Sequence, residues 1–219
     1  MNSDSIEPFF ATLRAANPTP TSELEYSTVF ELLVAVLLSA QATDAGVNKA
    51  TRRLFPVANT PQAILDLGPE GLEGYIKTIG LYRMKGKHLL EACRILVEQH
   101  GGAVPRDREA LQALPGVGRK TANVVLNVAW GEEAMAVDTH IFRVSNRTGL
   151  APGKDPLQVE RVLMERVPPE YRVDAHHWLI LHGRYVCVAR TPRCWQCAVA
   201  TYCDYQPKTP PPKVAAPKG

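Results

Sequence analysis

Four cysteines near the end of the chain have the spacing of a metal-binding loop. They form the run Cys187-x6-Cys194-x2-Cys197-x5-Cys203, which places four thiols within seventeen residues. Four thiolates suit either an iron–sulfur cluster or tetrahedral zinc. Zinc loops usually hold two close pairs, whereas this run has a single Cys-x2-Cys pair, which favours a [4Fe–4S] cluster without excluding zinc. The fifth cysteine, Cys93, has apolar neighbours on a predicted helix and is expected in the core.

Lys120 and Asp138 are further residues whose positions suggest chemistry. Lys120 is expected in the first turn of a helix, where positive helix-end charge disfavours the ammonium form and partial burial would add to that effect. Such an amine is a candidate nucleophile for a carbon with aldehyde character, although most lysines at such a place only contact phosphate. Asp138 is predicted to cap a helix, and partial burial among apolar neighbours would let its carboxylate orient or deprotonate an amine. The residues alone do not bring the two side chains together.

The segment around Lys120 predicts a hairpin that binds phosphate. The pattern Leu111-x-x-Leu114-Pro115-Gly116-Val117-Gly118-x-x-Thr121-Ala122 predicts a short helix, a tight turn and a second helix. Proline ends the first helix, and Gly116 and Gly118 permit positive φ and close approach of another backbone. The second helix starts with free amide groups, which form an anion site suited to a DNA phosphate. The pattern resembles the helix-hairpin-helix motif of many DNA-binding proteins.

Two stretches carry a more specific resemblance. Leu114-Pro115-Gly116-Val117-Gly118-Arg119-Lys120-Thr121-Ala122 and Val137-Asp138-Thr139-His140-Ile141-Phe142-Arg143-Val144 are similar to the signature sequences of the endonuclease III family, bifunctional DNA glycosylases that act on oxidised pyrimidines. The resemblance extends over almost the whole chain apart from its tail. It implies that Lys120 attacks the sugar C1′, expels the base and forms a Schiff base, after which β-elimination breaks the strand on the 3′ side. It also implies that Asp138 activates the lysine and stabilises positive charge on the sugar. His140 lies near the same site by this resemblance, and a simple packing role suits it equally well.

The same resemblance assigns roles in opening the duplex, because a stacked base cannot present its C1′ to a lysine and must be flipped out. It implies that Gln41 fills the gap and that Leu81 wedges against the opposite strand. After Leu81-Tyr82 this chain carries Arg83-Met84, where relatives usually have small or amide residues. The basic residues around this segment predict a local positive face: Lys77, Arg83, Lys85, Lys87 and Arg94.

The cysteine spacing matches the cluster loop of the same family, so the resemblance implies that Cys187, Cys194, Cys197 and Cys203 hold a [4Fe–4S] cluster with a structural role. Arg190 and Arg193 lie between the first two cysteines. We expect this loop to contact DNA phosphates through these two arginines.

The elements that must position these residues are predicted to be helical, with no convincing strand pair. Thr28 followed by Glu31 forms a capping box before the run 30–38, which is apolar on nearly all sides and is expected in the middle of a core. A second apolar helix is expected from about Arg119 to Trp130. Further helix starts are predicted from capping residues: Thr60, Asp107, Asp138, Asp155 and Asp174.

We therefore expect an all-α protein of two helical domains with the active site in the cleft between them. One domain is a helical bundle over residues 22–132 that contains the helix-hairpin-helix. The other joins residues 1–21 to 133–205 and holds the iron–sulfur cluster. Residues 206–219, which carry five prolines and three lysines and no acid, are expected to form a disordered tail.

Composition sets the broad class. The chain has 219 residues, 45% hydrophobic and 21% charged, as in a soluble globular protein. The net charge of +3 equals the charge of the three tail lysines, so DNA binding must depend on local basic faces and backbone amides. The start resembles no signal peptide, and the most apolar segment, Leu32 to Ala40, is far shorter than the roughly 18 residues of a membrane span. We expect a cytoplasmic monomer with no membrane partner, whose partner is double-stranded DNA with a damaged pyrimidine or an abasic site.

Two other functions remain open. A monofunctional adenine glycosylase of the mismatch-repair kind would share the fold and the cluster. That family typically lacks the lysine at the Lys120 position and carries an extra C-terminal domain. A non-enzymatic DNA clamp would use only the hairpin, and its binding would respond to Lys120→Ala only through the loss of one charge.

Overall fold

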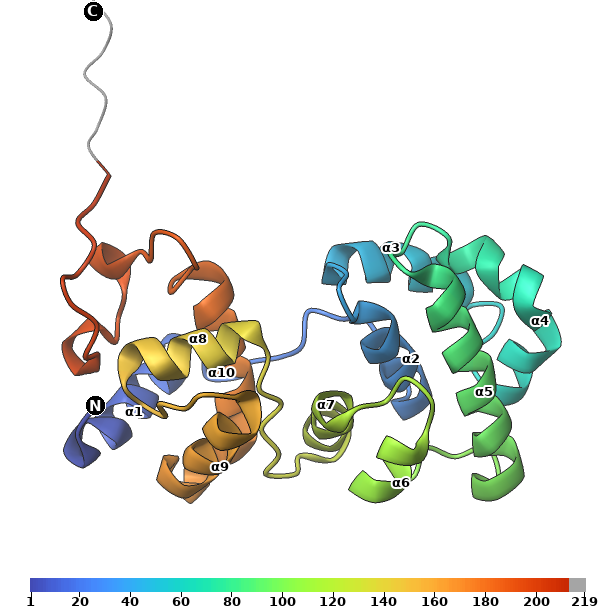
Figure 1. Cartoon of the computed structure of the whole chain (residues 1–219), viewed down its shortest axis with the longest axis horizontal. Helices are drawn as coiled ribbons and strands as arrows, with labels where there is room; N and C mark the ends of the chain where they lie inside the picture. Colours follow the sequence, from blue (N-terminus) through green and yellow to red (C-terminus); the bar gives the residue numbers. More distant parts are fainter. Residues whose placement is uncertain (213–219) are drawn as a thin grey trace, which may run out of the picture. The chain divides into compact units, whose positions relative to one another are not determined.

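A computed structural model describes residues 1–212 of the chain, and in these residues every regular element is a helix. The prediction of an all-α protein is therefore confirmed (Figure 1). Residues 213–219 of the expected disordered tail lie outside the described residues. The α-helices are α1 (Ile6–Ala16), α2 (Val29–Ser39), α3 (Asp44–Leu54), α4 (Pro61–Ile76), α5 (Tyr82–His100), α6 (Arg108–Ala113), α7 (Arg119–Trp130), α8 (Thr139–Thr148), α9 (Pro156–Arg166) and α10 (Arg172–Tyr185). The short 3-10 helices are η1 (Ser3–Ser5), η2 (Pro169–Tyr171), η3 (Cys194–Gln196) and η4 (Ala200–Tyr202).

The described chain forms two compact units. One is Ser22–Ala136, and the other joins Met1–Thr21 to the chain from Val137 onward. The boundary between the two units lies between Ala136 and Val137, four residues after the boundary expected at 132/133. Its physical reason is local, because Ala134 belongs to the apolar core of the first unit and the side-chain amide of Asn123 donates to the carbonyl of Met135 at 3.0 Å.

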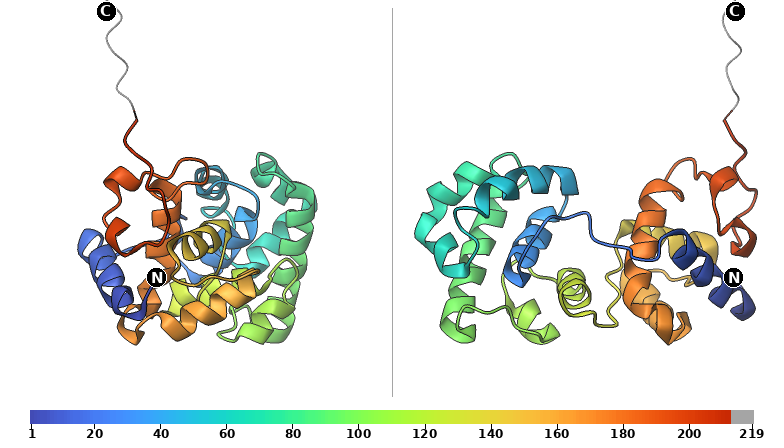
Figure 2. Two further views of the ribbon diagram at one scale, coloured as in Figure 1. Left: turned by 60° about the vertical axis from the view of Figure 1, so that its left-hand side comes forward. Right: turned by 180° about the vertical axis from the view of Figure 1, so that it is seen from behind.

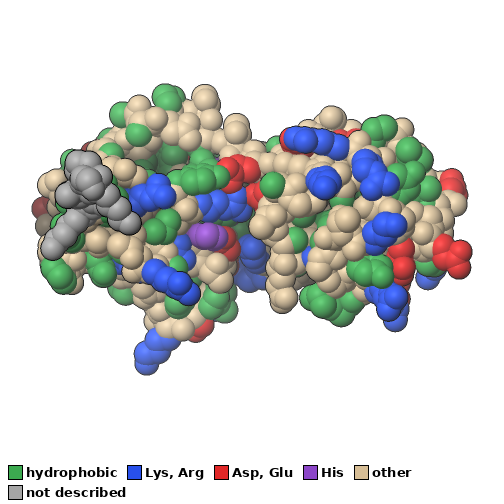
Figure 3. All heavy atoms as spheres, turned by 90° about the horizontal axis from the view of Figure 1, so that it is seen from above, with side chains coloured by type: hydrophobic (Ala, Val, Ile, Leu, Met, Phe, Trp, Pro, Cys, Tyr) green, Lys and Arg blue, Asp and Glu red, His purple; other side chains and the backbone are tan. Residues whose placement is uncertain are grey.

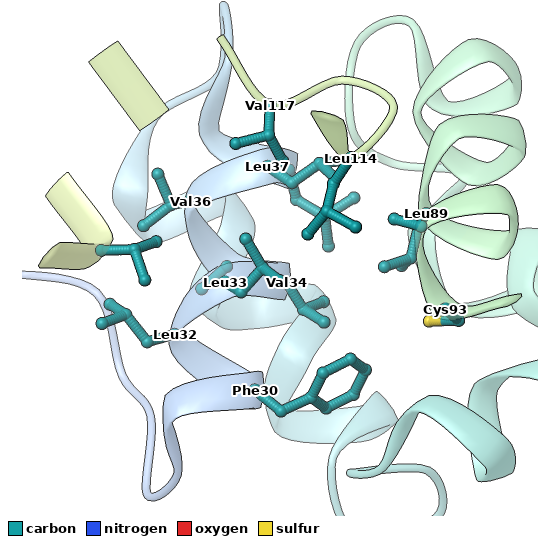
Figure 4. Close-up of a cluster of buried hydrophobic side chains, with 14 of the residues drawn as sticks. Phe30, Leu32, Leu33, Val34, Val36, Leu37, Leu89, Cys93, Leu114 and Val117 are labelled. Carbon is teal, nitrogen blue, oxygen red and sulfur yellow. The ribbon is translucent and has the colours of Figure 1, made fainter. Parts of the chain in front are cut away.

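Helix α2 is the centre of the unit Ser22–Ala136. Its residues from Phe30 to Leu38 are all buried, and α3, α5 and α7 pack on it (Figure 4). The predicted cap is present, since the amide of Glu31 donates to Thr28 Oγ1 at 3.1 Å. The Glu31 carboxylate in turn accepts from the amide of Ser27 at 2.6 Å, one residue earlier than in a regular capping box. Cys93 is fully buried beside this helix, as predicted, and burial raises the pKa of its thiol to about 12.

The second unit joins the first helix of the chain to the last. α1 packs on α10 (Figure 2). Phe10 of α1 stacks on Tyr171 of η2, with ring centroids 5.7 Å apart. The indole N–H of Trp178 donates to the carbonyl of Asn17 at 2.8 Å, which fixes the end of α1. α8 packs on α10 as well. The N-terminal segment is thus part of this unit and not an appendage.

Most predicted caps start a helix, and one does not. Thr60, Asp107, Asp138 and Asp155 each accept a backbone hydrogen bond at the start of a helix. Asp174 was predicted to do the same, and that prediction is wrong. It lies within the first turn of α10, because the 3-10 turn Pro169–Tyr171 leads directly into this helix at Arg172. No helix within residues 1–212 is long and apolar enough to cross a membrane.

Candidate functional site

The predicted hairpin is present as α6, a tight turn and α7. The turn is closed by the amide of Leu114 on the carbonyl of Leu111 at 3.1 Å and by the amide of Val117 on the carbonyl of Leu114 at 3.0 Å. These three side chains are buried, and Leu114 and Val117 lie beside α2 (Figure 4). The apolar side of the hairpin therefore anchors it in the core, and its polar backbone faces outward.

The two glycines of the hairpin behave differently. Gly116 has φ +79°, a conformation that favours glycine, and a Cβ atom there would lie in a tight contact 3.1 Å from the side chain of His88 on α5. Gly118 has φ −88°, so it does not use the positive φ that glycine permits. A Cβ atom on Gly118 would have no atom within 4 Å, and as N-cap of α7 the residue offers no side chain to the first-turn amides. The space above these amides is thus open to an anion.

Lys120 is the second residue of α7 and its side chain is exposed. The partial burial that would add to the helix-end effect is absent at this residue. The amine is held at the positive end of a helix that begins immediately after the hairpin turn. Chemically, this arrangement offers an accessible amine directly beside a candidate phosphate site.

Asp138 belongs to the other unit and is the N-cap of α8. Its Oδ1 accepts hydrogen bonds from the amides of His140 at 2.9 Å and Ile141 at 2.8 Å. The side chain is half-buried, and because both bonds end on Oδ1, the second oxygen is free to meet a ligand. His140 Nδ1 lies 3.2 Å from a guanidinium nitrogen of Arg143 on the next turn. Lys120 and Asp138 are thus positioned by separate units, each through a helix start.

Gln41 and Leu81, the two residues expected to open the duplex, share an unusual backbone. Within the described chain they are the two non-glycine residues with positive φ, at +55° and +59°. Such backbone is rare for side-chain-bearing residues and often marks a functional position. Both side chains are exposed, Leu81 to 53% of its surface. The adjacent Met84 is 51% exposed, so two apolar side chains lie open at the start of α5.

The expected positive face around α5 is present in part. Lys77, Arg83, Lys87 and Arg94 are exposed, whereas Lys85 is only 5% exposed and does not belong to this face. In the space-filling view, Lys and Arg side chains lie at several separate places on the surface, and acidic side chains lie beside some of them (Figure 3). The positive charge is therefore spread over the face and not gathered into one patch.

The four clustered cysteines line one cavity. Cys187, Cys194, Cys197 and Cys203 share its wall with Arg147 and His182. Burial raises the pKa of the Cys187 thiol and raises that of Cys197 to about 11. Within residues 1–212, no three His, Cys, Asp or Glu side chains converge on one point as ligands of a metal ion. Four thiols around one cavity, with a guanidinium beside them, still form a donor set that fits an anionic cluster with four cysteine ligands.

Two arginines that we did not single out in the sequence hold this loop. Arg147 of α8 donates to the carbonyls of Val188 at 2.8 Å and Ala189 at 2.9 Å, and its Nη1 lies 3.5 Å from Cys187 Sγ. Arg143, one turn earlier, donates from Nε to the carbonyl of Cys187 at 3.0 Å. The sequence signal was their i, i+4 spacing, but nothing in it gives acceptors about forty residues further along the chain.

Three further basic residues belong to the cysteine loop or follow it: two are exposed, and one binds backbone carbonyls near the last cysteine. Arg190 and Arg193, expected to contact phosphate, are both exposed. Lys208, from the segment expected to be a disordered tail, donates to the carbonyls of Cys203 at 2.6 Å and Tyr205 at 2.7 Å. The chain around the cysteines is therefore held by cationic side chains that bind backbone carbonyls.

Comparison with known proteins gives one consistent family. Residues 34–169 match the model of the HhH-GPD superfamily of base excision DNA repair proteins. The chain is 61% identical over 208 residues to endonuclease III of Haemophilus influenzae, covering 95% of this chain and 99% of that protein. It is 64% identical over 196 residues to endonuclease III of Escherichia coli strain K12, covering 90% and 93%. Among solved structures, a trapped covalent intermediate of endonuclease III with DNA matches with a TM-score of 0.87 and 44% identity, covering 93% of this chain and 96% of that one.

Proposed function

The chain belongs to the endonuclease III family, within the HhH-GPD superfamily of base excision DNA repair proteins, and on that premise we propose that it removes oxidised pyrimidines from double-stranded DNA and cleaves the resulting abasic site by β-elimination. It is a DNA glycosylase with abasic-site lyase activity. The observation that carries the finer proposal is the place of Lys120, an exposed amine in the first turn of the helix that leaves the hairpin. We further propose that it acts as a monomer in the bacterial cytoplasm.

Lys120 performs the covalent chemistry in this proposal. Its neutral amine attacks C1′ of the flipped nucleotide, the C1′–N glycosidic bond breaks, and the base leaves with the electron pair and takes up a proton. One proton then leaves the lysine nitrogen, the C1′–O4′ bond of the sugar breaks while O4′ takes up a proton, and the nitrogen forms a protonated C=N bond to C1′. Removal of a C2′ proton expels the 3′ phosphate and breaks the strand. The imine makes this last step possible because it withdraws electrons from C2′.

Asp138 assists at two points. Its Oδ1 is fixed by the two amides of α8, so Oδ2 is the oxygen that receives a proton from the Lys120 ammonium and faces positive charge on the sugar. This role requires that DNA binding bring Lys120 and Asp138 to the same nucleotide. His140 contributes to the same site through its position in the first turn of α8.

The nucleotide reaches Lys120 only after leaving the duplex. We propose that Gln41 enters the gap in the stack and that Leu81 separates the opposite base, because both side chains are exposed on turns whose backbone conformation is otherwise rare. The hairpin amides around Gly116 and Gly118 hold a backbone phosphate beside the lesion. Arg190 and Arg193 add phosphate contacts from the cysteine loop.

We propose that Cys187, Cys194, Cys197 and Cys203 hold a [4Fe–4S] cluster, which ties the loop together and takes no part in hydrolysis or elimination. Arg143 and Arg147 hold the same loop from α8, the helix that Asp138 caps. The loop and the proposed catalytic carboxylate thus share one supporting helix.

Borohydride reduction in the presence of a duplex with an oxidised pyrimidine tests the proposal. The wild-type protein is expected to give a covalent protein–DNA adduct, and Lys120→Ala none, while Lys120→Ala still binds the duplex. Lys154→Ala is the matched control, because it removes the same charge from an exposed lysine in the other unit and should form the adduct normally. No adduct from a wild-type protein that binds the duplex would favour a monofunctional glycosylase or a non-enzymatic clamp.

A further inference from the structure

Lys85 is the one lysine of the basic segment that does not face solvent. Its side chain is 5% exposed, and its Nζ donates a hydrogen bond to the main-chain carbonyl of Leu38 at 2.8 Å. Burial lowers the pKa of its ammonium group, and within residues 1–212 that group forms no ion pair with a carboxylate. A buried cation without an anionic partner is unfavourable, so its presence indicates a requirement for its particular hydrogen bond.

The acceptor of this bond is the end of α2. The last four carbonyls of a helix have no partner within the helix. Ser39 Oγ donates to the carbonyl of Val36 at 2.8 Å, and the amide of Ala42 donates to that of Ser39 at 2.9 Å. The carbonyl of Leu38 is bound from another helix, by Lys85. The negative end of the α2 dipole also favours a cation at this place.

The turn that follows this helix end carries Gln41. Ala40 has φ −54° and ψ 116°, and Gln41 has φ +55°, which are the dihedral angles of a type II turn closed by the Ala42 amide. Glycine usually occupies the position of Gln41 in such a turn. A turn with this backbone persists only where its flanks hold it, and one flank is the helix end bound by Lys85.

Lys85 also belongs to the turn that carries Leu81. Its amide donates to the carbonyl of Leu81 at 3.0 Å, the first hydrogen bond of α5. The two turns lie side by side, since a Cβ atom on Gly80 would be 3.9 Å from the carbonyl oxygen of Gln41. A single residue therefore holds both turns, through its backbone on one side and its ammonium group on the other.

We propose that Lys85 is a positioning residue that couples the Gln41 turn to the Leu81 turn, so that both side chains enter the duplex in one fixed arrangement. This inference rests on the proposed function of Gln41 and Leu81 in flipping the nucleotide. Without the hydrogen bond to Leu38, the end of α2 loses its connection to α5 and the two side chains move independently. Excision should then fail where the base must be extracted from a pair, and not where it is already unpaired.

The test uses the full chain with its bound cofactor and two duplexes, one with the lesion paired and one with it in an unpaired bubble. Lys85→Met removes the ammonium group and keeps the length of the side chain. We expect it to lower the ratio of paired to unpaired excision rates by about tenfold, because small misplacements of positioning groups have effects of this order. Lys85→Arg, which keeps charge and donor, should recover part of the ratio. Lys49→Met, which removes an exposed lysine of the same unit outside the positive face, should leave the ratio unchanged.

A second measurement does not depend on activity. Amide hydrogen exchange at Ala42 should be faster in Lys85→Met than in the wild type, with no change at Gly149 in the other unit. If Lys85→Met does not fold, Lys85→Leu, which also removes the donor, carries both measurements. An unchanged excision ratio with unchanged exchange at Ala42 would overturn the inference. A wild-type protein that excises neither lesion would instead refute the proposed function, and exchange at Ala42 would still decide whether Lys85 holds the turn.

Discussion

Two regions of the molecule present residues to DNA in the proposed function, and they are held in different ways. The Gln41 turn follows α2, and Leu81 directly precedes α5. Both helices contribute buried side chains to the apolar core of their unit. The cysteine loop has only two short 3-10 helices, and it is held by arginine side chains that bind its carbonyls and by the cavity its thiols share. Apolar burial can thus position a loop that follows a helix, whereas the cysteine loop, which has little regular structure, is held by polar side chains.

The largest effect should come from removing a cysteine ligand. Cys197→Ser should lower the bound iron and release the loop between Cys187 and Cys203, because the hydroxyl of serine is a poor ligand and the loop has little other structure. Iron content and amide hydrogen exchange in the loop measure this. Cys93→Ala is the control, since Cys93 lies in the core of the other unit and should keep the iron. Equal iron in Cys197→Ser and the wild type would contradict the assignment of this ligand.

A substitution in the apolar core should destabilise the unit Ser22–Ala136 and leave the cysteine loop unchanged. Leu33 is 1% exposed on α2, and Leu33→Ala should lower the free energy of unfolding of the unit Ser22–Ala136 by about 2–5 kcal/mol. Urea unfolding, followed by amide hydrogen exchange in each unit, measures the stability of the two units separately. Iron content should remain that of the wild type. Loss of iron in Leu33→Ala would show that the two regions are not held independently.

Arg147 provides an intermediate case, because it holds the loop without being a ligand. Arg147→Met removes two hydrogen bonds to carbonyls, so opening of the loop should become easier by about 1–3 kcal/mol. The observable is exchange of the Arg193 amide, which donates to the carbonyl of Val186 at 2.9 Å. Arg161→Met removes the same charge from an exposed position on α9 and should not change that exchange. Slow exchange in both variants would mean that the cluster alone holds the loop.

The same contrast explains what the sequence could predict. Helix α2 and the limits of α7 followed from local patterns, namely a capping threonine, apolar spacing and a hairpin of proline and glycine. Its charge alone put Lys85 on the predicted basic face. Its helical spacing predicts burial instead, because Leu89, Ala92 and Leu96 follow it at i+4, i+7 and i+11 and are buried. The carbonyls bound by Arg143 and Arg147 belong to irregular backbone, and no periodicity predicts where such acceptors lie.

The smallest expected effect is the change in stability on replacing Gln41 by glycine. It tests whether the left-handed backbone of Gln41 is strained and held in place by the neighbouring helices. A left-handed backbone costs a side-chain-bearing residue about 1–2 kcal/mol, and glycine loses about 0.5–1 kcal/mol more chain entropy on folding. Gln41→Gly should therefore leave stability unchanged or raise it by up to about 1.5 kcal/mol, while excision of a paired lesion falls because the side chain that fills the gap is gone.

Ala42→Gly is the matched control, since Ala42 does not have a positive φ and should lose about 0.5–1 kcal/mol from chain entropy alone. Thermal unfolding of the two variants, beside excision rates on paired and unpaired lesions, gives the comparison. A Gln41→Gly variant as destabilised as Ala42→Gly would mean that the glutamine side chain itself stabilises the turn. The positive φ at this position would then follow from contacts of that side chain, and the support from α2 and α5 would not be needed to explain it.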